Sequence, residues 1–198
     1  MAAAMKRCLL VSVLFLLIAA PVVGQATYTL VESSKVWVDG TSNRDDWTVY
    51  AESIEGQVAL EAVPDSGLPV IQEATFSVLK RQLKSRKSSI MDRLMHKTLK
   101  ATQNNAITFV LAAAEVTPLE DGMFSIAATG DLTLAGESKP IELTLHGTIT
   151  EDGVLQLTGT YPMLLSNHGM EPPTALYGAL RTGDEVVVNF DVHYAISQ

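Results

Sequence analysis

The sequence predicts an all-β fold, a closed antiparallel β-barrel of about eight strands with one amphipathic helix. Three observations predict it: apolar and polar residues alternate with a period of two over most of the chain, turn signals separate these runs, and a single segment has a helical period instead. Such alternation is typical of strands with one buried face and one solvated face. Closure into a barrel removes the exposed edges of long strands.

The C-terminal half is predicted to be a meander of long strands. Asp121-Gly122 and Asp152-Gly153 are hairpin signals, because glycine supplies the positive φ that tight turns need. The stretches Gly136 to Pro140 and Gly183-Asp184 predict two further turns. The predicted strands lie near 106–117, 122–134, 139–150, 153–165 and 184–196.

The N-terminal half adds strands near 27–31, 34–42, 46–62 and 71–79, the third of which could be two strands broken at Gly56. Trp37 is out of phase with Val36 and Val38, so either set could face inward. Gly40 marks either a bulge or a close approach to a ligand. A β-sandwich is the alternative architecture, and it would fill the same apolar faces with side chains and leave no cavity.

One segment carries the helical period. Ser88 and Ser89 are suitable N-caps. The residues Ile90, Met91, Leu94, Met95, Thr98 and Leu99 form an apolar stripe, and Arg93, Lys97 and Lys100 lie on another face. We expect this helix to end near Gln103-Asn104-Asn105, and we expect a second short helical turn between Thr174 and Leu180.

Residues 1–24 are predicted to be a secretory signal peptide of the Sec type. Lys6 and Arg7 precede the apolar run from Leu9 to Ala20, which is shorter than the roughly 20 residues that span a bilayer. Cleavage before Gln25 or Thr27 fits the small residues there, and Met5 could be the true start. We therefore expect residues 25–198 to form a single domain in the periplasm, without a thiol, because Cys8 is the only cysteine.

The charge distribution is uneven in a chain whose net charge is −8. The segment from Lys80 to Lys100 holds eight of the 14 basic residues, with Asp92 as its only acid. It could dock on an anionic membrane surface through Lys80, Lys84, Lys87, Arg93, Lys97 and Lys100. Alternatively, the helix only covers the barrel and its bases are solvated. Nucleic acid is disfavoured as a partner by the acidic balance and by export.

No arrangement of residues predicts catalysis or a metal site. His146 and His193 fall on the polar phase of their strands, His96 lies opposite much of the helical stripe, and His168 lies in a loop. None is spaced from another His, Asp or Glu as metal ligands are. Asp191 and His193 share a strand face, but two solvated residues are the expected outcome. We therefore expect a protein without enzymatic activity and without a metal.

Several segments resemble the YceI-like family of periplasmic polyisoprenoid-binding proteins. In chain order they are Ser34-Lys-Val-Trp-Val-Asp-Gly-Thr-Ser-Asn43, Phe76-Ser-Val-Leu79, Met91-Asp-Arg-Leu-Met-His-Lys-Thr-Leu-Lys-Ala101, Ile107-Thr-Phe109, Gly130-Asp-Leu-Thr-Leu-Ala-Gly-Glu-Ser-Lys-Pro140 and Gly183-Asp-Glu-Val-Val-Val-Asn-Phe190. The resemblance implies a lipocalin-like barrel, with a helix against it and an apolar tunnel for an isoprenoid or another lipid. The helix lacks the acid-x-His-Leu-Arg-Ser type of motif expected of the family, which indicates a divergent branch whose ligand does not carry over.

The inward apolar set is the candidate binding site. It comprises Phe76, Val78, Met91, Met95, Phe109, Leu111, Phe124, Ile126, Tyr161 and Met163. The same residues would line a tunnel or fill a core. The first interpretation gives an exported carrier or reservoir of an isoprenoid, a quinone-like lipid or a fatty-acyl lipid, with no cofactor besides that lipid. The second gives a filled barrel that acts as an envelope-stress or protein-interaction factor.

Overall fold

The computed structural model describes residues 25–62, 68–86, 88–103 and 105–197, and the predicted signal peptide lies outside them. The strands are β1 (Gln25–Leu30), β2 (Lys35–Ser42), β3 (Trp47–Ala51), β4 (Ile54–Ala62), β5 (Pro69–Leu79), β6 (Leu83–Lys84), β7 (Ala106–Pro118), β8 (Phe124–Leu134), β9 (Glu137–Ile149), β10 (Leu155–Leu164), β11 (Thr174–Ala175) and β12 (Leu180–Ile196). The helices are α1 (Ser89–Thr98) and the short 3₁₀ turns η1 (Lys80–Gln82), η2 (Glu120–Gly122), η3 (Leu165–His168) and η4 (Leu176–Gly178).

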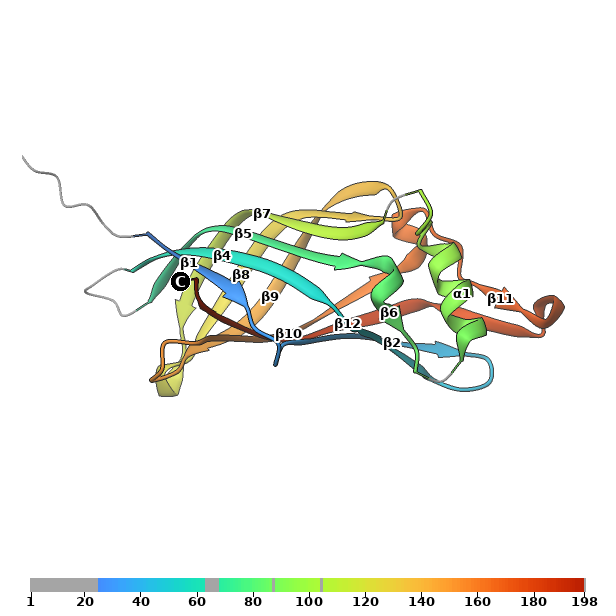
Figure 1. Ribbon diagram of the computed structural model, residues 1–198, viewed down its shortest axis with the longest axis horizontal. Coiled ribbons are helices and arrows are strands. Elements are labelled where there is room, and N and C mark those ends of the chain that lie inside the picture. The colour runs from blue at the N-terminus through green and yellow to red at the C-terminus, as the bar shows by residue number, and fades with distance from the viewer. Residues whose placement is uncertain (1–24, 63–67, 87, 104, 198) are drawn as a thin grey trace, which may run out of the picture.

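Eight antiparallel strands close into a barrel, as predicted. The ring runs β1-β4-β5-β7-β8-β9-β10-β12 and closes because β1 pairs with both β4 and β12. Figure 1 shows the long axis of the barrel, with α1 and β11 at one end and the C-terminus near the other. The predicted turns Asp121-Gly122 and Asp152-Gly153 are confirmed, with positive φ at both glycines.

Two neighbouring positions in the ring are each occupied by two shorter strands, one by β1 and β2 and the other by β4 and β3. β1 and β2 pair with successive parts of β12, and β3 pairs with β2 as β4 pairs with β1. The predicted strand 46–62 is therefore broken, but at 52–53 and not at Gly56. Gly56 lies inside β4, where a Cβ would be 2.7 Å from the Leu30 side chain. A glycine at position 56 therefore permits close packing against Leu30 and does not mark a turn.

Hydrogen bonds between Ser34 and His193 fix the bend between β1 and β2. The Ser34 hydroxyl accepts from the His193 N–H at 2.9 Å and donates to the His193 carbonyl at 3.0 Å. The Val31 N–H donates to the same carbonyl at 3.0 Å. The bend therefore leaves these backbone groups of β12 satisfied although the neighbouring strand is interrupted.

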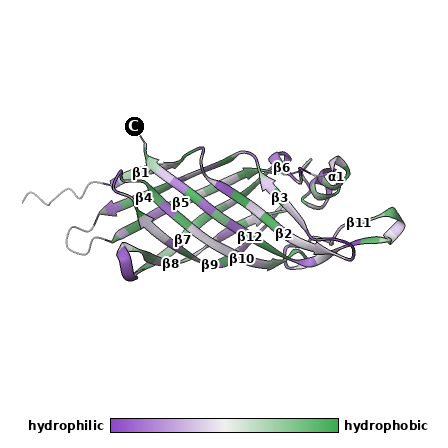
Figure 2. Ribbon diagram, turned by 90° about the horizontal axis from the view of Figure 1, so that it is seen from below, coloured by the Kyte–Doolittle hydropathy of each residue, from purple (hydrophilic) through white to green (hydrophobic). Residues whose placement is uncertain are grey.

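The inward phase of β2 is that of Val36 and Val38, which settles the open alternative. Trp37 points away from the interior, and its indole N–H donates to Asp39 at 3.1 Å. Trp47 lies beside Gly40, where a Cβ would come within 2.2 Å of the indole ring. Gly40 thus marks a close approach to Trp47. The alternation of apolar and polar residues along the strands is visible in Figure 2.

The predicted turn at Gly183-Asp184 is wrong, because β12 runs through it from Leu180 to Ile196. The register between β12 and β2 shifts between Thr182 and Val186. A Cβ on Gly183 would lie 2.6 Å from the Thr41 hydroxyl, so the glycine permits close packing at this irregularity. β12 thereby reaches the end of the barrel at which α1 lies.

Helix α1 begins as predicted and ends earlier. The Ser88 hydroxyl accepts from the backbone N–H groups of Ile90 and Met91, as an N-cap does. The helix ends at Thr98, not near 103–105, because Lys100 has a left-handed φ of 51°. The Ala101 N–H donates to His96 and the Lys100 N–H to Lys97, which is a Schellman motif. The buried Leu99 and Ala101 follow the last turn.

The second predicted helical turn is present as η4, between β11 and β12. Within the described ranges, no helix has the length and apolarity needed to cross a membrane.

Candidate functional site

The barrel encloses a cavity of about 990 Å³, at the upper end of the range for small-molecule sites. Nine of the ten predicted site residues line it, namely Phe76, Val78, Met91, Met95, Phe109, Leu111, Ile126, Tyr161 and Met163. The tenth, Phe124, is buried outside this lining, with its ring against Gly147. The interior of the barrel is therefore only partly filled by its own side chains.

The cavity has an apolar wall built from alternate residues of the ring strands. Phe76 on β5 and Phe109 on β7 are direct partners in the sheet and both face inward. Ile126 on β8 and Leu157 on β10 are buried on the same interior surface. Because side chains alternate along a strand, the period-two pattern is what placed these residues on one surface.

Tyr194 lines the cavity and belongs to the buried core cluster, beside Gly56. Burial raises the pKa of its hydroxyl well above the ordinary value for tyrosine. Burial also raises the pKa of Tyr161, so both phenols are neutral at physiological pH. The cavity wall therefore has no negative charge at these two tyrosines.

Helix α1 covers one end of the cavity. None of its residues is buried, although Ile90, Met91, Leu94 and Met95 all line the cavity. Its apolar face thus borders the cavity, although Met91 and Met95 also pack in part against the buried core. The flexible thioethers of Met91 and Met95 suit such a surface, because they adapt to varied apolar partners.

Polar contacts hold α1 against β6 and against Ser85, which follows that strand. Asp92 accepts a hydrogen bond from the Ser85 N–H at 2.8 Å, and the His96 imidazole lies 3.0 Å from the Leu83 carbonyl. Burial alone would raise the pKa of Asp92, but hydrogen bonds from Ser85 and the nearby charges of Lys84 and His96 outweigh it and lower this pKa. Asp92 is thus held as a carboxylate that fixes the helix.

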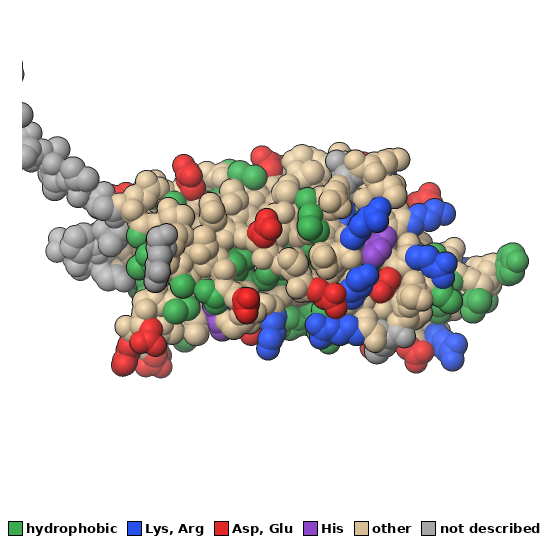
Figure 3. All heavy atoms as spheres, in the orientation of Figure 1, with side chains coloured by type: hydrophobic (Ala, Val, Ile, Leu, Met, Phe, Trp, Pro, Cys, Tyr) green, Lys and Arg blue, Asp and Glu red, His purple; other side chains and the backbone are tan. Residues whose placement is uncertain are grey.

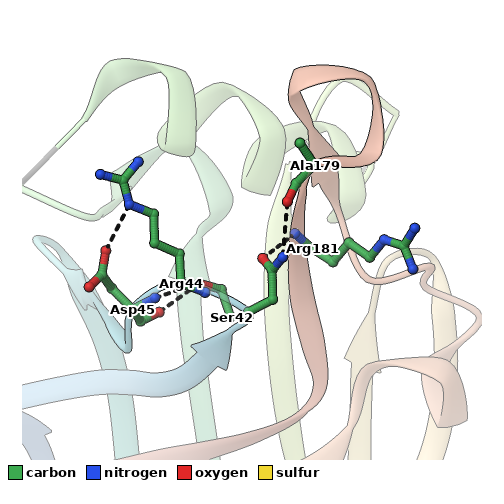
Figure 4. Close-up of polar contacts among 6 residues, drawn as sticks. Ser42, Arg44, Asp45, Ala179 and Arg181 are labelled. Atoms are coloured by element: carbon green, nitrogen blue, oxygen red, sulfur yellow. Dashed lines mark hydrogen bonds and ion pairs between the residues drawn. The ribbon is translucent and has the colours of Figure 1, made fainter.

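Polar lining residues gather at the α1 end, which we call the mouth. Apart from Thr75 and the two tyrosines, they are Ser42, Arg44, Asp45, Asp46, Trp47, Ser88, Thr98 and Thr182. In the β2–β3 turn, the Ser42 hydroxyl donates to the Asp45 carbonyl at 2.7 Å, and Arg44 pairs with Asp45 at 3.5 Å (Figure 4). The site is therefore an apolar interior with a polar rim. Sequence reasoning missed this rim, because the β2–β3 turn lies far from α1 in the chain.

The structure corrects one predicted surface base. Lys80 is 0 % exposed, and its ammonium is among the buried polar groups without a hydrogen-bond partner. Burial lowers the pKa of Lys80, and the charge of Lys100 lowers it further. Lys80 continues the inward phase of Phe76 and Val78, a signal that was available in the sequence. Lys87 lies outside the described residues, whereas Arg93 and Lys97 are exposed and Lys84 and Lys100 are half-buried.

The histidines are dispersed over the molecule. His146 is exposed, and His193 lies 3.2 Å from Asp191 and 3.0 Å from Ser33. His168 is buried in η3, where burial and the Lys139 charge lower its pKa although Glu137 opposes this shift. Across the described part of the chain, no three His, Cys, Asp or Glu side chains are grouped as ligands of a metal ion would be.

The family model described as the YceI-like domain matches residues 28–194, from β1 to β12. No curated protein matches the chain in sequence.

Solved structures share the fold. BcnA of Burkholderia cenocepacia is 18% identical, with a TM-score of 0.60, and the match covers 82% of this chain and 96% of that chain. A polyisoprenoid-binding domain from Saccharophagus degradans, implicated in plant cell wall breakdown, is 12% identical with a TM-score of 0.64 over 88% of this chain and 100% of that one. The Campylobacter jejuni YceI protein is 16% identical with a TM-score of 0.55, covering 76% and 84%. Identities this low establish a shared fold.

Proposed function

We propose that the barrel of this chain, which belongs to the YceI-like family, binds one long apolar ligand. The protein would act as an exported lipid carrier or reservoir. The ligand class is an isoprenoid, a quinone-like lipid or a fatty-acyl lipid. The Saccharophagus degradans domain of the same fold is described as polyisoprenoid-binding, which supports this class.

The apolar cavity of about 990 Å³ carries the proposal. Each methylene group that leaves water for such an interior contributes about 0.8 kcal/mol before the costs of association. A filled core would offer no such gain. The cavity therefore favours ligand binding over the alternative of a filled barrel that acts only through its outer surface.

The polar rim supports one orientation of the ligand. An apolar chain would extend from the mouth towards Leu157 and Val192, and a polar end would remain at the mouth beside Ser42 and Thr182. Burying a polar group without partners costs free energy, so the head group is better placed where hydroxyls and water can reach it. Met91 and Met95 of α1 would contact the part of the ligand nearest the mouth.

Export through a cleaved leader is the second part of the proposal. The basic start, the short apolar run and Pro21 support it. Intact mass of protein secreted by a bacterial host tests this part. A chain that begins near Gln25 supports export, and a chain that retains Cys8 contradicts it.

Native mass spectrometry of freshly purified protein, followed by solvent extraction, tests ligand binding. We expect an added mass that disappears on extraction and corresponds to a lipid with a long apolar chain. Titration with the apolar fluorophore N-phenyl-1-naphthylamine checks the emptied protein, whose affinity should fall when extracted lipid is added back. Protein that carries no lipid and binds no fluorophore would contradict the proposal.

A further inference from the structure

We infer that the mouth end of the barrel docks on an anionic lipid bilayer, with the tip of the β11–β12 hairpin inserted. This hairpin projects beyond α1 at the end of the molecule (Figure 1). At its tip Leu176 is 70 % exposed and Tyr177 is completely exposed, at 112 %. A leucine beside a tyrosine suits the interface of a membrane, where one side chain enters the apolar region and the other remains near the head groups.

The tip is held in a defined position. The Asn43 amide donates to the Ala179 carbonyl at 2.9 Å and accepts from the Arg181 N–H at 2.9 Å, while the Asn43 N–H donates to the Arg181 carbonyl at 3.0 Å (Figure 4). The Arg181 guanidinium donates to the Gly178 carbonyl at 3.0 Å. The β2–β3 turn thus fixes the hairpin that presents the tip.

The backbone of the tip is strained. Leu176 has φ 52° and Tyr177 has φ 56°, in the left-handed region that bulky residues rarely adopt. Neither side chain is buried, so packing within the barrel does not explain the strain. Strain of this kind is a reason to look for a function, and contact with a bilayer supplies one for these two apolar side chains.

Charge complementarity indicates an anionic surface. Arg93, Lys97, Arg44 and Arg181 are exposed at the mouth end, where Asp45, Asp46 and Glu171 are exposed as well. At the opposite end, the β7–β8 and β9–β10 turns carry Glu120, Asp121, Glu151 and Asp152 with no basic residue. Figure 3 shows Lys and Arg side chains over the α1 end, an apolar tip beyond them, and an acidic group at the far end. An anionic bilayer would attract the first end and repel the other.

Docking in this orientation would set the cavity mouth against the membrane. Leu176 lines the mouth as well as the tip, so an apolar ligand could leave the cavity at the lipid surface. This consequence rests on the proposed function, whereas docking itself does not depend on any ligand.

Co-sedimentation with vesicles tests the inference. The protein is mixed with vesicles of three parts phosphatidylcholine to one part phosphatidylglycerol, or with phosphatidylcholine alone. We expect binding to the first and little to the second, and we expect binding to weaken when NaCl rises from about 0.05 to about 0.5 M. Equal binding to both vesicles, or no binding to the anionic ones, would overturn the inference.

Two variants separate the contributions of the tip and of the charges. Tyr177→Asn keeps a residue that tolerates the left-handed backbone and removes the ring, and we expect affinity for anionic vesicles to fall about tenfold. Arg93→Glu with Lys97→Glu should reduce it by about tenfold or more. The matched control is Met123→Asn, an exposed apolar residue at the acidic end, which should bind as the native protein does.

The Tyr177→Asn variant also distinguishes insertion of the tip from self-association and from failure of ligand binding. Unchanged vesicle affinity in Tyr177→Asn would overturn the insertion of the tip. Sedimentation velocity without vesicles detects a second copy of the chain as the occupant, and a dimer abolished by Tyr177→Asn would assign the tip to self-association instead. Fluorophore binding by Tyr177→Asn should equal that of the native protein. Loss of docking with retained fluorophore binding therefore differs from failure of the proposed function.

Discussion

Phe76 on β5 and Phe109 on β7 are direct partners across the sheet, and both rings face the cavity. Phe76 also packs against the buried core and the Phe109 ring lies against Gly130, but enlarging either side chain removes space from the ligand. We predict that Phe76→Trp or Phe109→Trp lowers affinity for N-phenyl-1-naphthylamine at least about tenfold, while the free energy of unfolding changes by less than about 1.5 kcal/mol. Fluorescence titration and urea denaturation measure the two quantities.

The matched control is Val110→Trp, because Val110 adjoins Phe109 on β7 but is exposed. It should leave fluorophore affinity unchanged. Unchanged affinity in both Phe variants would mean that these side chains lie away from the bound ligand.

Gly40 and Trp47 give a second prediction. A Cβ at position 40 would lie 2.2 Å from the indole ring, so Gly40→Ala should destabilise the protein by about 1–3 kcal/mol. Trp47→Leu in the same chain should recover part of the loss, because it removes the clashing ring. Urea unfolding followed by far-UV circular dichroism of both single variants and the double variant measures the coupling. Strictly additive changes in the free energy of unfolding would contradict a clash between residue 40 and the Trp47 ring.

The sequence was informative wherever one local rule decides the outcome. Side-chain alternation places Phe76, Phe109 and Ile126 on one surface, and Ser88 caps α1 through its own hydroxyl. Closure of the barrel followed from the number and length of the strands.

Features that depend on pairing between distant segments were missed. The break at 52–53 arises where β1 and β2 divide β12 between them, and no residue there signals a turn. Phe124 alternates correctly, yet it fills the space beside Gly147 and lies outside the cavity lining. The polar rim includes the β2–β3 turn, which is held to the start of β12 by hydrogen bonds between Asn43 and Arg181 that no local pattern encodes.

Lys80 leads to a prediction about alkaline pH. Burial and the charge of Lys100 lower its pKa in the folded protein below the ordinary lysine value of 10.5, so the folded state binds this proton less well than the unfolded chain does. Stability should therefore rise with pH between the folded pKa and 10.5, where the unfolded chain also loses the proton. Lys80→Met should stabilise the protein at neutral pH by about 1–3 kcal/mol and abolish this rise.

Chemical denaturation across the alkaline range measures the effect of Lys80. Lys97→Met is the control, because Lys97 is exposed on α1. If Lys80→Met retained the same rise in stability as the native protein, the burial of the ammonium would not be its cause.

His168 gives the corresponding prediction on the acid side. Burial and the charge of Lys139 lower its pKa below the ordinary histidine value of 6.5, and its Nδ1 is among the buried atoms without a hydrogen-bond partner. Because the unfolded chain takes up this proton more readily, stability should fall as pH drops from 6.5 through the folded pKa. His168→Gln should flatten the decline in Tm, whereas His146→Gln at an exposed site should not.

The position of His168 connects this decline to the cavity. Leu165 and Met170 flank the histidine in the chain and both line the mouth. A proton on the buried imidazole would therefore favour loosening of the segment that forms this part of the wall. We expect fluorophore affinity to fall with Tm on acidification of the native protein and to fall less in His168→Gln. An affinity that declines equally in both proteins would place the acid-sensitive group elsewhere.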